Sequence, residues 1–200
     1  MKKMVLILFL VLIVFSGKSF SQSNDVAKPD RLHPALLVID IQNGYLPHMD
    51  KADVEPAMGY INMYINFFRK NGFPIIRIYH SDLKYGYGPK EGSEEFEFPK
   101  SVLIKPDDPK VIKHYGDAFN KTELDKILKE KKVNTIFLCG LSAVGCVLAT
   151  YIGAEDHDYS AFFLKDAVIS HKAAYTKNIE DIFDALGYEA VNVMLDNAEK

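Results

Sequence analysis

Cys146 stands at a position where a cysteine can act as a nucleophile. Residues 134–140 are a short apolar run that predicts a buried strand, a tight turn leads to Cys146, and residues 147–154 continue with helical composition. Backbone N–H groups and the dipole at a helix start favour the thiolate, which is the reactive form of cysteine. The alternative is a buried, unreactive cysteine, because free cysteines are often simply part of a core.

Two charged residues, Asp40 and Lys113, each end an apolar run of the kind that forms a buried strand. Burying a charge is costly unless it is paired. A carboxylate near Cys146 could accept the thiol proton, and a nearby ammonium could keep that carboxylate ionised. Taken alone, each residue is equally well explained as a strand-end charge that reaches water.

Strands and helices alternate along the chain, which predicts a parallel sheet covered by helices on both faces. Strands are expected at 35–40, 74–79, 111–113, 134–140, 159–165 and 190–195. Helices are expected at 54–70, 121–131 (with Asn120 as a candidate cap), 147–154 and 172–186. The fold class is therefore α/β, a single-domain three-layer α/β/α structure with a mostly parallel sheet. Ligands bind at the carboxyl edge of such sheets, where Asp40, His80, Lys113, Cys146 and Asp166 are expected to meet.

The first 21 residues have the pattern of a secretory signal peptide. A basic start precedes an unbroken apolar run over residues 4–15, and small residues follow up to Ser21, after which cleavage is expected. The run is short for a membrane span of about 20 residues, so an uncleaved anchor is the weaker alternative. We expect an exported protein, periplasmic or secreted, with a linker at 22–34 and one domain at 35–200.

Charge and cysteine content exclude several function classes. Removing residues 1–21 removes three lysines and no acid, which takes the formal net charge from −3 to −6. An acidic protein without a clustered basic face is a poor candidate for binding nucleic acid. Cys139 and Cys146 flank a tight turn with diverging side chains, so no structural disulfide is expected.

Four stretches of the chain resemble the isochorismatase-like cysteine hydrolases, the superfamily of nicotinamidases and N-carbamoylsarcosine amidohydrolases. The stretches, which span nearly all of the chain after the signal peptide in the family's order, are Leu37–Gln42, Lys113–Phe119, Gly140–Val147 and Asp166–Ser170. The resemblance implies the isochorismatase-like hydrolase fold, which is a three-layer α/β/α structure, and a catalytic triad of Asp40, Lys113 and Cys146. It also implies a cis peptide bond between Leu141 and Ser142, an oxyanion hole formed by the backbone N–H groups of Ser142 and Cys146, and a homo-oligomer.

Departures from the family pattern narrow the expected chemistry. Nicotinamidases carry an Asp-x-His pair that holds a metal, whereas this chain has Tyr79-His80-Ser81-Asp82 and no further histidine before His114. We therefore expect no metal and no cofactor. Relatives that cleave a vinyl ether lack the cysteine, so Cys146 implies hydrolysis of a C–N bond in a small amide or N-carbamoyl compound. The alternative is a catalytically silent binding or scaffold protein that keeps the fold.

The expected substrate pocket is less well specified. Gln42, Tyr45, His80 and Phe119 are the residues we expect to border it. His80 is explained equally well as a pocket donor or as a packed residue at the end of a strand. The glycine- and tyrosine-containing loop 84–92 is a candidate lid, or alternatively a flexible surface loop or an oligomer contact.

Overall fold

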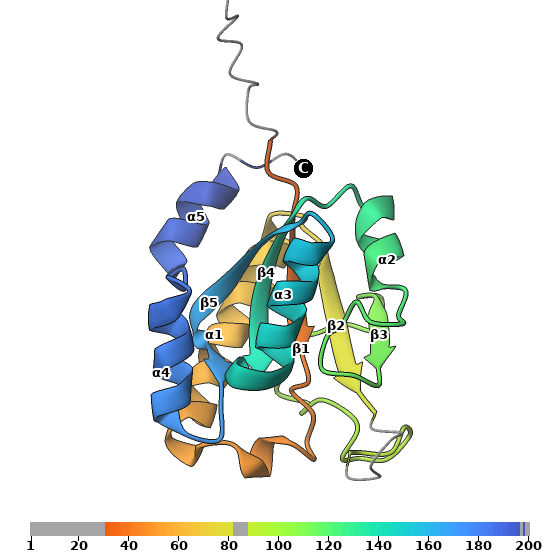
Figure 1. Ribbon diagram of the computed structural model, residues 1–200, viewed down its shortest axis with the longest axis vertical. Helices are drawn as coiled ribbons and strands as arrows, with labels where there is room; N and C mark the ends of the chain where they lie inside the picture. The colour runs from red at the N-terminus through yellow and green to blue at the C-terminus, as the bar shows by residue number, and fades with distance from the viewer. Residues whose placement is uncertain (1–30, 82–87, 197, 199–200) are drawn as a thin grey trace, which may run out of the picture. The chain divides into compact units, whose positions relative to one another are not determined.

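Five parallel strands form a single sheet in the computed structural model, which describes residues 31–81, 88–196 and 198. The strands are β1 (Pro34–Ile39), β2 (Ile75–His80), β3 (Lys110–Lys113), β4 (Thr135–Leu141) and β5 (Ser160–Ile169), and their order across the sheet is β3-β2-β1-β4-β5 (Figure 1). The expected signal peptide, most of the linker and part of loop 84–92 lie outside the described residues.

Strand register brings the functional candidates to one edge of the sheet. β1 lies at the centre, where Ile39 pairs with Ile78 of β2 and with Gly140 of β4. His80, the last residue of β2, pairs with Lys113, the last residue of β3. All strands run in the same direction, so Asp40, His80, Lys113 and the turn after β4 share the carboxyl edge.

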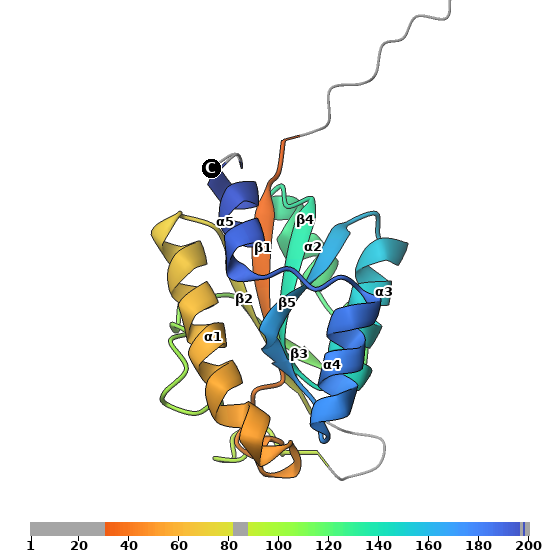
Figure 2. The same cartoon turned by 90° about the vertical axis from the view of Figure 1, so that its left-hand side faces the viewer.

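Helices cover both faces of the sheet and make the three layers that the alternating pattern predicts. The helices are α1 (Lys51–Lys70), α2 (Leu124–Glu130), α3 (Leu148–Asp156), α4 (Ala173–Ile182) and α5 (Tyr188–Asp196), and a short 3₁₀ helix spans Leu46–His48. α1 and α5 pack on one face, and α2, α3 and α4 pack on the other (Figure 2). No helix within residues 31–81 and 88–196 is long and apolar enough to cross a membrane.

Apolar side chains of β1 alternate between the two faces and so belong to two separate cores. Leu36 and Val38 pack with α1, whereas Leu37 and Ile39 pack with α2 and α3. Helix α1 begins where the Asp50 side chain accepts a hydrogen bond from the N–H of Ala52 at 3.0 Å, a capping contact worth about 1 kcal/mol. Burial on both faces explains why β1 reads as a continuous apolar run.

The predicted last strand at 190–195 is wrong, because this segment is helix α5. Val191 and Leu195 are buried, whereas Val193 between them is 62% exposed. A strand would place all three on the same face, and a helix places only residues four apart together. The valine content of the segment favours a strand, but the spacing of its buried residues is helical.

Asp166 does not end its strand, contrary to expectation. β5 continues to Ile169, and between the pairs Leu138–Phe163 and Gly140–Val168 it contains an irregularity that accommodates the extra residues. Asp166 lies in this irregular part with a φ of 62° and an exposed side chain. It therefore does not join the carboxyl edge of the sheet.

Several helix boundaries also differ from the prediction, and α1 begins at Lys51, three residues earlier than expected. α2 begins at Leu124 and not at residue 121, because Lys121 adopts a φ of 58° that a helix cannot contain. Its first N–H donates to the Thr122 hydroxyl at 3.2 Å, and Asn120 is not the cap. α4 ends at Ile182, four residues earlier than predicted.

Candidate active site

Asp40 and Lys113 form a buried ion pair at the carboxyl edge of the sheet. The Lys113 Nζ lies 2.8 Å from Asp40 Oδ2, and the two side chains are 0% and 2% exposed. Nζ also donates to the backbone carbonyl of Tyr115 at 3.1 Å. Burial lowers the pKa of Lys113, but the interactions with Asp40 and Cys146 raise it by more. The net effect is a raised pKa, so the ammonium stays protonated.

Asp40 is held in place by an unusual backbone. It follows β1 with a φ of 53°, and its N–H still donates to the carbonyl of Ile78 at 2.9 Å. Asp is one of the few residues apart from glycine that tolerates this region. The turn moves the carboxylate out of the strand's alternation and into the edge of the sheet.

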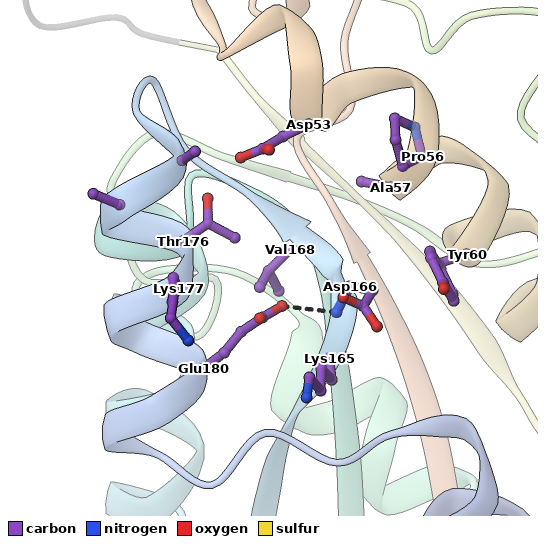
Figure 3. A pocket seen from close by; sticks show the side chains of 12 residues that line it. Asp53, Pro56, Ala57, Tyr60, Lys165, Asp166, Val168, Thr176, Lys177 and Glu180 are labelled. Atoms are coloured by element: carbon purple, nitrogen blue, oxygen red, sulfur yellow. Dashed lines mark hydrogen bonds between the residues drawn. The ribbon is translucent and has the colours of Figure 1, made fainter.

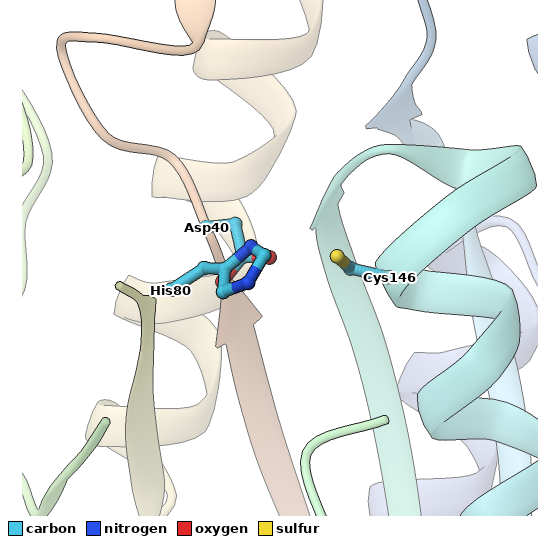
Figure 4. Close-up of side chains that lie close together, drawn as sticks. All are labelled: Asp40, His80 and Cys146. Carbon is cyan, nitrogen blue, oxygen red and sulfur yellow. The ribbon is translucent and has the colours of Figure 1, made fainter. Parts of the chain in front are cut away.

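The Cys146 sulfur lies beside this pair. Ligand atoms of Asp40, His80 and Cys146 all lie within 4.8 Å of one another, and the sulfur points toward the other two side chains (Figure 4). Cys146 is partly buried and Cys139 is fully buried. Neither cysteine is in a disulfide. The structure therefore brings the acid, the ammonium and the thiol together from three distant parts of the chain.

The electrostatics of Cys146 differ from the expectation of a stabilised thiolate. Burial, followed by the neighbouring Asp40 carboxylate, raises the pKa of the thiol to about 12, against the lowering effect of the Lys113 ammonium. The position of Cys146 agrees with the expectation: Gly145 has a non-helical backbone (φ −123°, ψ −107°) that breaks the turn Ala143–Val147, and Cys146 follows this kink at the entry to α3. The resting group is thus a neutral thiol beside a base.

The turn that carries Cys146 is shaped by its backbone. Gly140 has a φ of 113°, and a Cβ there would collide with the backbone carbonyl of Ile39. The Leu141–Ser142 peptide bond is cis. The Ser142 carbonyl then accepts hydrogen bonds from the N–H groups of Gly145 at 2.9 Å and Val147 at 3.2 Å. These contacts close the turn and fix Ser142 and Cys146 within one short loop.

Of the expected pocket residues, His80, Tyr45 and Gln42 lie at the site. The Tyr45 hydroxyl is 3.4 Å from His80 Nδ1, and the two rings stack with centroids 6.0 Å apart. Gln42 is buried and makes two hydrogen bonds to the backbone of His80. Its Oε1 accepts from the His80 N–H at 2.8 Å, and its Nε2 donates to the His80 carbonyl at 3.0 Å. Gln42 therefore positions His80, a role that the sequence pattern does not reveal.

Phe119 does not lie at the site, contrary to expectation. Its ring is 6% exposed and stacks on His157 at 4.7 Å and on Tyr159 at 5.7 Å. His157 follows the last residue of α3, whereas Cys146 precedes its first residue. The nine residues of α3 separate the two by roughly 13 Å along the helix, so Phe119 belongs to the core at the opposite end.

A separate cavity of about 480 Å³ opens between α1, β5 and α4, and no triad residue lines it (Figure 3). Asp166 lies here, and its N–H donates to Glu180 Oε1 at 2.7 Å. No cysteine lines this cavity, so the expected thiol nucleophile is not here. The reactive groups are at the carboxyl edge of the sheet.

Comparison with known proteins agrees with this arrangement. A sequence profile of the isochorismatase domain matches residues 34–191. The chain belongs to the isochorismatase family. Its members are hydrolases, and this protein is one of them.

Three relatives illustrate the similarity of this isochorismatase-family chain. It is 31% identical over 152 residues to the uncharacterised isochorismatase family protein YddQ of Bacillus subtilis, covering 74% of this chain and 81% of the other. It is 28% identical over 98 residues to maleamate amidohydrolase of Pseudomonas putida, covering 48% and 46%. The N-carbamoylsarcosine amidase structure of Thermoplasma acidophilum superposes with a TM-score of 0.67 at 23% identity, covering 78% and 95%, and so shares the fold.

Proposed function

We propose that this protein hydrolyses a C–N bond of a small amide or N-carbamoyl compound through a thioester on Cys146. One observation carries the proposal: the buried Asp40–Lys113 pair at 2.8 Å has the Cys146 sulfur within 4.8 Å of its carboxylate. A nucleophile, a base within reach of it and a third group that orients the base are the signature of covalent catalysis. The names of the maleamate and N-carbamoylsarcosine relatives support an amide-type substrate.

In the first step Asp40 accepts the thiol proton as the sulfur attacks the substrate carbonyl carbon. The thiol is neutral at rest, so proton removal accompanies attack and a standing thiolate is not needed. Lys113 keeps Asp40 in its basic, ionised form before the attack. It also offsets the negative charge that develops on the sulfur.

The attack yields a tetrahedral oxyanion, which the N–H groups of Ser142 and Cys146 are proposed to stabilise. A preorganised donor of this kind is worth roughly 3–4 kcal/mol. The oxyanion collapses, the C–N bond breaks, and Asp40 returns its proton to the leaving nitrogen. The products of this half-reaction are ammonia or an amine and the acyl-enzyme.

Water completes the cycle by attacking the thioester carbonyl. Asp40 takes a proton from that water, and the proton returns to the sulfur as the C–S bond breaks. The second product is a carboxylic acid, or a carbamic acid when the substrate is an N-carbamoyl compound. His80 lies beside the reacting sulfur and Tyr45 stacks on His80, and these two residues are the proposed contacts for the rest of this small substrate.

The test is an ammonia-release assay over small amides, ureides and N-carbamoyl compounds, with wild type, Cys146→Ala and Cys139→Ala compared. Cys139 is the matched control, because it is the other cysteine and its side chain is fully buried. We expect wild type and Cys139→Ala to release ammonia and Cys146→Ala to release none. No release by any of the three across the panel would favour the silent binding or scaffold protein.

Export is proposed on the N-terminal sequence alone. Residues 1–21 have the basic start, apolar run and small residues of a signal peptide, with cleavage after Ser21. Intact-mass analysis of the protein recovered from culture medium or periplasm should give a chain that starts at Gln22. A cell-retained chain that still starts at Met1 would contradict both cleavage and export.

Association of identical copies is proposed from the family resemblance and from exposed apolar side chains. Ile152 and Ile182 are 50% and 69% exposed, on α3 and α4 of the same layer. Light scattering after gel filtration should give a mass of at least two chains. A mass of one chain at micromolar concentration would contradict association.

A further inference from the structure

Three donor groups of different chemistry converge at the carboxyl edge of the sheet. Asp40, His80 and Cys146 offer a carboxylate oxygen, an imidazole nitrogen and a sulfur, all within 4.8 Å of one another (Figure 4). They come from the ends of β1 and β2 and from the turn after β4. Zinc bonds of about 2.0–2.3 Å to such atoms need ligands separated by roughly 3.5 Å, so a small closure would let all three bind one ion.

We propose that Asp40, His80 and Cys146 form a reversible site for Zn²⁺ or another thiophilic divalent cation, and that the bound ion blocks the Cys146 sulfur. A set of one sulfur, one nitrogen and one oxygen suits zinc and its soft neighbours. Calcium and magnesium require oxygen ligands and are not expected to bind. These three ligands differ from the Asp-x-His pair that holds the metal in nicotinamidases, which this chain lacks.

The Asp40 carboxylate supplies the observation that points most directly to a ligand. Asp40 is 1% exposed, and its Oδ1 has no hydrogen-bond partner within the described part of the chain. Oδ2 faces the Lys113 ammonium at 2.8 Å. The Cys146 thiol also interacts with this carboxylate, and a metal ion would take the place of the thiol proton between the two groups.

His80 is oriented in the way that a metal-binding histidine requires. Gln42 holds its backbone from both sides, while the Tyr45 hydroxyl lies 3.4 Å from Nδ1 and the Tyr45 ring stacks on the imidazole. Outer contacts of this type fix ring orientation in metal sites. The site would therefore pay little further ordering entropy when an ion binds.

Binding exchanges the thiol proton for the metal. The Cys146 S–H bond breaks, the proton leaves to solvent, and a sulfur–metal bond forms without any change of oxidation state. The Lys113 ammonium beside Asp40 repels the ion and limits its affinity, which keeps the binding reversible. Binding does not depend on the identity of the substrate, so this inference stands or fails separately from the proposed hydrolysis.

The test is a titration of the purified protein with Co²⁺, followed by absorption spectroscopy and calorimetry, with Zn²⁺ added as competitor. We expect one Co²⁺ per chain, a sulfur-to-cobalt charge-transfer band, and displacement of Co²⁺ by Zn²⁺. Zn²⁺ should also protect Cys146 from alkylation by iodoacetamide. Absence of the band, or alkylation unaffected by saturating Zn²⁺, would overturn the proposal.

Variants separate this site from adventitious metal binding. Cys146→Ala should lose the charge-transfer band, and His80→Ala should bind at least about tenfold more weakly. Cys139→Ala should bind as wild type, because the Cys139 side chain is fully buried in the core beneath α1 and is not one of the converging donors. Lys113→Met should bind at least about tenfold more tightly, since it removes the repelling charge. Unchanged affinity in Cys146→Ala, or weaker binding by Lys113→Met, would overturn the assignment.

Discussion

Lys113 ends β3 and Asp40 directly follows β1, two strands that are not neighbours, yet their charged groups are 2.8 Å apart and buried. β2 separates β3 from β1, so the lysine side chain spans the width of the intervening strand to reach the carboxylate. Register makes this possible, because Lys113 pairs with His80 at the carboxyl end of β2. The pair fixes a base beside Cys146 and ties together the edge of the sheet on which the proposed chemistry depends.

Breaking this pair should destabilise the fold strongly. Lys113→Met leaves the Asp40 charge buried without its partner, and loss of one partner of a buried pair costs about 3–5 kcal/mol. The double variant Asp40→Asn, Lys113→Met removes both charges and should lose less stability than the two single variants combined. Urea unfolding of all four proteins measures this coupling. Additive losses would show that the two side chains do not act as a pair.

Alkylation of Cys146 should report a raised thiol pKa. Because burial and Asp40 raise the pKa to about 12, iodoacetamide at pH 7.5 should label Cys146 at least tenfold more slowly than a free cysteine of pKa about 8.5. The rate should rise as pH increases toward 12. Asp40→Asn removes a raising interaction and should speed labelling, whereas Lys113→Met should slow it. An apparent pKa below 8.5 would contradict this reading of the site.

The raised pKa of Lys113 also predicts a loss of stability in alkali. The folded protein holds this proton more tightly than the unfolded chain, so the stabilisation is complete below the unfolded value of about 10.4. It should disappear as pH rises through the higher folded value. Unfolding free energies measured between pH 9 and 12 should therefore fall more steeply for wild type than for Lys113→Met. Equal slopes would count against the ion pair.

Gly140→Ala should disrupt the turn before Cys146. The added Cβ would meet the Ile39 carbonyl, and the φ of 113° is unfavourable for any other residue, so we expect a loss of about 2 kcal/mol or more. Gly59→Ala is the matched control, because that glycine is in helix α1 with open space around it and should gain about 0.5–1 kcal/mol. Thermal unfolding distinguishes the two. Similar effects at both positions would contradict the proposed crowding.

Gln42→Ala should impair the site through His80. It removes two hydrogen bonds to the His80 backbone and leaves the N–H of this partly buried residue without its acceptor, at a cost of about 1 kcal/mol or more. With a substrate from the amide panel, KM should rise more than kcat falls, because His80 is a proposed substrate contact. Gln42→Glu keeps the acceptor and should restore part of the loss. A pure kcat effect would place Gln42 in the chemical step instead.

Much of the fold could be predicted because its strands are nearly continuous apolar runs. β1 and β4 are buried along their whole length, and charged residues stand out where they follow or end an apolar run, as Asp40 does after β1 and Lys113 does in β3. Helix α5 could not be separated from a strand by composition, since its valines suit either structure. The departure at Asp166 depends on pairing between β4 and β5, which local sequence does not specify.

The site shows the same division between local pattern and tertiary packing. The triad residues follow from strand ends and from the resemblance to the family. The raised pKa of the Cys146 thiol could not be predicted from the sequence, because it depends on burial that only the packed structure creates. The expectation that Phe119 borders the pocket is wrong, because its ring packs on His157 in the core. Gln42 gave no signal of its clamp on His80, whose partner groups are 38 residues away.

The most direct test of the account is the covalent intermediate on Cys146. A substrate found in the amide panel would be mixed with enzyme, quenched in acid during turnover, and digested for peptide mass spectrometry. We predict an acyl group on the peptide containing Cys146 and none on Cys139, with hydroxylamine removing it. Turnover without any adduct, together with normal turnover by Cys146→Ala, would contradict thioester catalysis at this site.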